Sequence, residues 1–156
     1  MNDITRMDWS SLGEPKMYSW LLEARSNDRN VRLAALGHIK EVIAPWELLD
    51  GYGSSKDLQR LSESLVPEAV IPFLIDLFPL QDETGKTFML EIFYDLARYK
   101  YVNLDFIPSD KKNTYFMWTD KIRDKLYIYI SFFNSLLTDV SFNIQQNAQA
   151  LINILT

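Results

Sequence analysis

One pattern constrains the fold of this chain more than any other, and it occurs in residues 28–39, 82–93 and 141–152. Each copy starts with a small polar residue, has a basic or amide residue four positions later, and places small or apolar residues seven and eleven positions later. In order, these positions are Asp28, Arg32, Ala35 and Ile39, then Asp82, Lys86, Met89 and Phe93, then Ser141, Gln145, Ala148 and Ile152. A polar first residue is a typical helix N-cap, and the later positions share one helical face. The pattern therefore predicts three capped helices, each with a small or apolar residue where a partner helix crosses.

Spacing of apolar residues and prolines predicts the remaining helices. These helices cover about residues 15–26, 67–78 (with a start as early as 61) and 120–137. The helices that contain the three copies of the pattern are expected over 28–44, 82–98 and 141–155. The Tyr-Ile-Tyr-Ile run at 127–130 also suits a strand by alternation, but the period sustained over five turns favours a helix. At 156 residues we expect one domain, 1–156, with loop insertions near 44–60 and 100–119. The expected fold class is all-α, with about six or seven helices in stacked hairpins that form an α-α superhelix.

Three runs within residues 15–98 resemble a known group of proteins. They are Asp-Arg-Asn-Val-Arg-Leu-Ala-Ala-Leu at 28–36, Pro-Glu-Ala-Val-Ile-Pro-Phe-Leu-Ile-Asp-Leu-Phe at 67–78, and Phe-Met-Leu-Glu-Ile-Phe-Tyr-Asp-Leu-Ala at 88–97. Together they resemble small bacterial HEAT/armadillo-like repeat proteins. Many of those proteins look like immunity proteins of polymorphic-toxin or contact-dependent growth inhibition systems. The chain departs from the group's pattern in the longer segment after Ala44, and nothing from Tyr99 onward matches it.

The composition favours a soluble, cytoplasmic protein. The chain has no cysteine, which excludes disulfides and thiolate metal sites and suits a reducing compartment. Its first residues are polar and lack the apolar core of a signal peptide. The most apolar stretch, 126–133, is too short to span a bilayer. We therefore expect no contact with a membrane.

Charge is distributed unevenly along the chain. Residues 41–95 contain eleven acidic and three basic side chains, a balance of −8, whereas residues 96–125 have a balance of +3. A field of −8 repels nucleic acid and attracts a basic partner, although a solvated acidic face without any partner has the same composition.

The sequence offers few candidates for catalytic, phosphate-binding or metal-binding residues. His38, the only histidine, lies on the predicted buried stripe with Val31, Ala35, Ile39 and Val42, so a core histidine is favoured over a metal ligand or base. The Gly-Tyr-Gly-Ser-Ser-Lys run at 51–56 lacks phosphate-loop spacing and is interpreted as a turn. Glu91 and Asp95 lie one turn apart, with Arg98 as an ordinary ion-pair partner. We expect no enzymatic activity, no cofactor and no metal.

Acidic residues next to aromatic residues are instead the candidates for partner binding. Tryptophan and tyrosine are common at interface hot spots, and surrounding acids speed association with a basic protein. The candidates are Trp46, Glu47, Asp50, Tyr52, Asp57, Glu91, Asp95, Tyr115 and Trp118. For Trp46 and Trp118 the alternative is that each ring folds back on the helical core as a loop anchor.

The leading hypothesis is an immunity protein that binds a basic toxin domain, such as a nuclease, tightly and 1:1 through an acidic surface. The first alternative is an adaptor that binds a basic cellular protein. A HEAT-like DNA glycosylase is disfavoured, since such an enzyme needs a basic concave surface to hold DNA.

Overall fold

The described part of the protein, residues 2–49, 55–102 and 107–156 of a computed structural model, forms helices and no strands. The predicted all-α fold class is therefore confirmed. The α-helices are α1 Met17–Glu23, α2 Arg29–Ile43, α3 Trp46–Leu49, α4 Ser55–Ser62, α5 Val66–Leu77, α6 Glu83–Arg98, α7 Ser109–Tyr127, α8 Ile130–Ser135 and α9 Phe142–Leu155. Short 3₁₀ turns occupy Ile4–Arg6, Phe78–Leu80, Tyr99–Tyr101 and Leu136–Thr138. Within the described ranges, no helix has the length and apolar character needed to cross a membrane.

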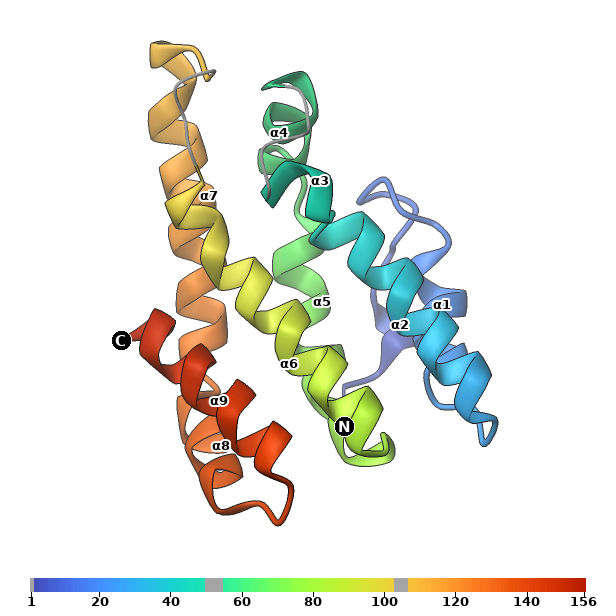
Figure 1. Ribbon diagram of the computed structural model, residues 1–156. Coiled ribbons are helices and arrows are strands. Elements are labelled where there is room, and N and C mark those ends of the chain that lie inside the picture. Colours follow the sequence, from blue (N-terminus) through green and yellow to red (C-terminus); the bar gives the residue numbers. More distant parts are fainter. Residues whose placement is uncertain (1, 50–54, 103–106) are drawn as a thin grey trace.

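The three helices of the repeated pattern lie next to one another. Figure 1 shows α2, α6 and α9 running in the same direction across one layer, with α6 in the middle. Helix α6 packs against α2 on one side and against α9 on the other. Helix α1 packs against α2, and α7 packs against α4, α5 and α6. Positions far apart in the sequence therefore meet along α6.

The predicted N-caps are correct in all three helices. Side-chain oxygens of Asp28, Asp82 and Ser141 accept hydrogen bonds from backbone N–H groups in the first turns of α2, α6 and α9. Two further contacts join neighbouring helix starts: Arg29 pairs with Asp82, and the Ser141 hydroxyl donates to Glu83 at 2.7 Å. The caps therefore stabilise each helix, and the two contacts link the starts of neighbouring helices.

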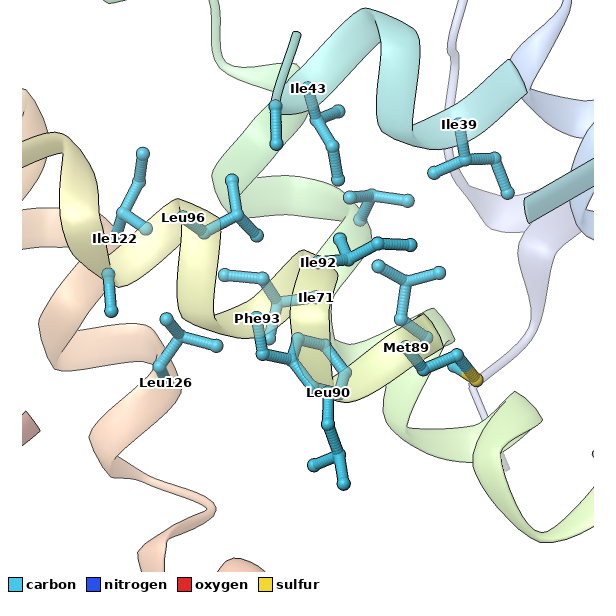
Figure 2. Packing of buried hydrophobic residues seen from close by; sticks show 14 of the residues in the cluster. Ile39, Ile43, Ile71, Met89, Leu90, Ile92, Phe93, Leu96, Ile122 and Leu126 are labelled. Carbon is cyan, nitrogen blue, oxygen red and sulfur yellow. The ribbon is translucent and has the colours of Figure 1, made fainter. Parts of the chain in front are cut away.

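The core is a continuous apolar cluster centred on α6. Figure 2 shows Ile39 and Ile43 of α2, Ile71 of α5 and Ile122 and Leu126 of α7 converging on the side chains of α6. At the predicted crossing positions, Ala35, Met89 and Ala148 are fully buried. Burial of apolar surface throughout this cluster is the dominant favourable term in folding.

The predicted buried stripe of α2 is partly wrong. Ala35 and Ile39 are buried as expected, but Val31 is 37% exposed and His38 is exposed too. His38 stacks on Trp20 of α1, with ring centroids 5.5 Å apart and an interplanar angle of 16°. The stripe instead includes Leu36 and Ile43, because α2 must face both α1 and α6. His38 is therefore not a core residue.

Both predicted loop insertions contain helix. Helix α3 and most of α4 lie within 44–60, and α7 begins at Ser109 rather than near 120. Turn-forming residues dominate these segments locally, but α4 and α7 pack against each other and bury Leu58. Tertiary burial thus outweighs the local turn propensity.

The predicted continuous helix 120–137 is broken. Helix α7 ends at Tyr127, α8 begins at Ile130, and Ile128 between them is 69% exposed. Helix α7 packs mainly against α4, α5 and α6 and also touches α9, whereas α8 packs against α9. The break therefore divides the predicted helix into a part against several helices and a part against the last helix.

Two glycines inside helices are expected to respond in opposite ways to alanine. A Cβ on Gly85 would lie 2.9 Å from the Cβ of Gln81, a buried side chain that donates to the Ala24 carbonyl at 3.0 Å. Gly85→Ala is therefore expected to destabilise the protein by about 1–3 kcal/mol. A Cβ on Gly37 meets no atom within 4 Å. Gly37→Ala, the matched control, is expected to stabilise by about 0.5–1 kcal/mol, because alanine is the better helix former. Urea unfolding measures the change in stability of both variants. Stabilisation by Gly85→Ala would contradict the interpretation that Gln81 leaves no room for a Cβ.

Candidate functional site

A depression that contains several of the predicted partner-binding residues lies along the exposed side of α6. A pocket of about 440 Å³ is lined by residues of α2, α3, α6 and α9, namely Lys40, Trp46, Glu91, Tyr94, Asp95, Arg98, Asn147 and Ala150. A second pocket of about 410 Å³ is lined by Glu83, Thr84, Thr87, Phe88, Glu91 and Asn143. Glu91 lines both, so the two pockets adjoin. We call the two together the α6 groove.

Three of the residues predicted for partner binding meet in the larger pocket of the α6 groove. They are Trp46, Glu91 and Asp95. Helix α2 ends at Ile43, and Pro45 redirects the chain into α3, so Trp46 stands at the rim with 54% of its surface exposed. The other two extend from successive turns of α6. The stacking of α2 on α6 brings the tryptophan to the acids.

Asp95 is the centre of an ion cluster. Its carboxylate lies 3.3 Å from the Lys40 ammonium and 3.4 Å from the Arg98 guanidinium, and its side chain is only 16% exposed. Lys40 also donates to the Ala44 carbonyl at 3.2 Å, at the end of α2. The pairing with Arg98 was predicted from local spacing. Lys40 was missed, because no local pattern relates two residues 55 positions apart.

Glu91 differs from Asp95 although both lie on one face of α6. Glu91 is exposed, and within the described chain it has no ion pair. Partial burial and then the negative charge of Asp95 raise the pKa of the Glu91 carboxyl, while the charge of Lys40 acts in the opposite direction. Glu91 is therefore a hydrogen-bond acceptor at the groove surface. Ionising its carboxyl costs slightly more free energy in the folded protein than in the unfolded chain.

This cost predicts that Glu91→Gln stabilises the free protein at neutral pH. A raised carboxyl pKa means that the native state binds more protons, so stability falls as pH rises from the ordinary carboxyl pKa through the raised one. The gain at pH 7 is expected to be less than about 1 kcal/mol, because an exposed charge is screened. It should vanish at acid pH, where both states are protonated. Urea unfolding against pH measures it, with Glu63→Gln, at the exposed residue that follows α4, as the control. A loss of stability at pH 7 would contradict this interpretation of Glu91.

The prediction that Tyr115 and Trp118 are exposed aromatics is wrong. They are 1% and 6% exposed, because α7 turns them toward α4, α5 and α6. The Trp118 indole donates to the Ser64 carbonyl at 3.2 Å. The ring is thus an anchor on the core, which was the alternative for this residue.

These buried aromatics support the α6 groove from behind. The Tyr115 hydroxyl donates to the Tyr99 backbone carbonyl, and the Tyr99 hydroxyl donates to the Ile43 carbonyl at 3.0 Å. Burial raises the pKa of both phenols well above the ordinary value, so both stay neutral donors. Since Ile43 ends α2, this chain of hydrogen bonds holds the segment that carries Lys40 and leads into Trp46.

Asp57, another predicted partner-binding residue, does not line the described α6 groove. Asp57 lies on α4, where its carboxylate is 3.4 Å from the Arg60 guanidinium. Glu47 belongs to α3, and its side chain lies outside what the structure describes. Asp50 and Tyr52 lie outside the described residues.

The acidic block 41–95 does not form one unpaired surface. Asp82 pairs with Arg29, and Asp95 pairs with Lys40, so bases that precede the block neutralise two of its acids. The hydrogen bond from the Gly85 N–H and then the contact with Arg29 lower the pKa of Asp82. The charge balance of the sequence therefore overstates the free negative charge of this face.

Neither metal clusters nor known proteins add to this picture. In the described ranges, no group of three or more His, Cys, Asp or Glu side chains could hold a metal ion. No family model, no curated protein and no solved structure matches the chain.

Proposed function

We propose that this chain is a non-catalytic protein-binding module that receives a segment of a partner protein in the α6 groove. One observation carries the proposal. An exposed tryptophan and a glutamate that has no ion pair among the described residues line the same pocket as an ion cluster. Tryptophan bordered by charged groups is typical of interface hot spots. Layers of parallel helices offer extended surfaces for holding another macromolecule.

We further propose a HEAT/armadillo-like repeat whose partner is a basic bacterial toxin domain, neutralised by 1:1 binding in the cytoplasm. The resemblance of residues 15–98 to immunity proteins supports this partner, as does the net charge of −5. An adaptor that binds a basic cellular protein through the same groove is the second candidate. The residues of the α6 groove support the adaptor as well, but the resemblance to immunity proteins does not.

Co-expression with a toxin domain encoded beside this chain tests the proposal. We expect a 1:1 complex by size-exclusion chromatography with light scattering, together with protection of the host cells. Glu91→Lys should weaken the complex by about 10- to 100-fold, because it reverses a charge at the centre of the groove. Glu63→Lys makes the same change in net charge just after the end of α4 and should have little effect.

Two outcomes would contradict the proposal. Absence of both a complex and protection would exclude the immunity role. Equal loss of affinity in the Glu91 and Glu63 variants would mean that overall charge, and not the α6 groove, drives binding. Recovery of a defined cellular partner from cells without a toxin locus, again dependent on Glu91, would favour the adaptor.

A further inference from the structure

Within the larger pocket of the α6 groove, the basic residues are already engaged. Lys40 and Arg98 both lie within 3.4 Å of the Asp95 carboxylate. The lining contains two acids and two bases, but the pairing is unequal: Asp95 has both cations, and Glu91 has none within the described chain. The pocket is therefore neutral in total and has one unneutralised carboxylate at its surface.

The walls around Glu91 are suited to a flat cation. Trp46 offers an exposed indole on the α3 side, and Tyr94 and Asn147 line the same pocket from α6 and α9. A guanidinium group can form two parallel hydrogen bonds with a carboxylate and stack on an indole at the same time. An ammonium group gains the charge contact and a weaker contact with the ring, without the two-point geometry.

We propose that the part of the pocket between Glu91 and Trp46, the Glu91–Trp46 corner, binds an arginine side chain of the partner protein. This inference rests on the proposed function and makes it more specific. The guanidinium lies against the Glu91 carboxylate and the Trp46 ring, and the Lys40–Asp95–Arg98 cluster keeps the competing internal cations away from Glu91. In the free protein, the negative charge of Glu91 has a cost in free energy. A bound arginine neutralises this charge and removes that cost.

The test uses N-acetyl-arginine N-methylamide as a probe of the full chain, followed by ¹H–¹⁵N NMR. We expect saturable shifts of the Trp46 indole N–H and of the Glu91 amide. The lysine analogue should bind several-fold more weakly, and the uncharged citrulline analogue should give no saturable shift. Glu91→Gln should weaken arginine binding by about tenfold or more, which is the loss expected for a charged hydrogen-bonded pair. Glu63→Gln is the matched control and should retain affinity.

Three results would overturn the inference: citrulline binding as well as arginine, equal binding to the Glu91→Gln variant, or shifts that are absent or centred elsewhere. Its failure is distinguishable from that of the proposed function. If arginine does not bind the corner but Glu91→Lys still weakens the toxin complex, the groove function stands and this inference fails. If arginine binds the corner but no groove variant affects the complex, the arginine site stands and the proposed function fails.

Discussion

Trp118→Ala is expected to destabilise the protein by about 3–5 kcal/mol, the largest effect that we predict for a single substitution. Trp118 is 6% exposed. The centroid of its ring lies 5.1 Å from the ring centroid of Tyr99 and 5.7 Å from that of Tyr115. Alanine would leave a cavity between α7 and the helices beneath it. It would also leave the Ser64 carbonyl without the indole donor. Urea unfolding followed by circular dichroism measures the loss.

Met117→Ala is the matched control for this prediction. Met117 is next in the sequence but 63% exposed, so its truncation should change the free energy of unfolding by less than about 0.5 kcal/mol. A Trp118→Ala variant with unchanged stability and weakened partner binding would contradict the assignment of Trp118 to the core. It would restore the interface role predicted from the sequence.

The error at Trp118 could have been avoided from the sequence alone. Tyr115, Trp118, Ile122 and Leu126 follow one another at helical spacing, and the structure buries all four on one face of α7. Pro108 and the lysines after it favoured a loop through residue 119, and this composition concealed the spacing. Extending the Ile122–Leu126 period by two turns toward the N-terminus would have revealed the helix and the anchor together.

Local features were predictable and long-range contacts were not. Each N-cap, such as Asp28 in α2, depends on a polar residue and the helix start that follows it. By contrast, the stacking of His38 on Trp20 and the pairing of Lys40 with Asp95 depend on how the helices are placed next to one another. The sequence therefore indicated Glu91 and Asp95 as a pair but not the difference between them. That difference, one carboxylate neutralised and one without an ion pair in the described part of the chain, is what makes the groove a candidate site.

Asp95→Ala is expected to cost about 1–3 kcal/mol, because it leaves the Lys40 ammonium without its carboxylate. The Lys40 side chain is only 19% exposed, so water replaces the lost partner incompletely. The double variant Lys40→Met/Asp95→Leu should be close to the wild type in stability. Apolar replacement of both members of a largely buried ion pair is often neutral or favourable, whereas removal of one member is not. Arg98, with its side chain 34% exposed, keeps access to water in both variants.

A double-mutant cycle measured by urea unfolding decides what the ion cluster contributes. Recovery of stability in the double variant, with weaker arginine binding at the Glu91–Trp46 corner, would mean that the pair is kept for the shape and charge of the groove. Apolar contacts would then hold α2 to α6 equally well, and the two charges would serve binding. A double variant as unstable as Asp95→Ala would contradict this interpretation and make the cluster a structural link between α2 and α6.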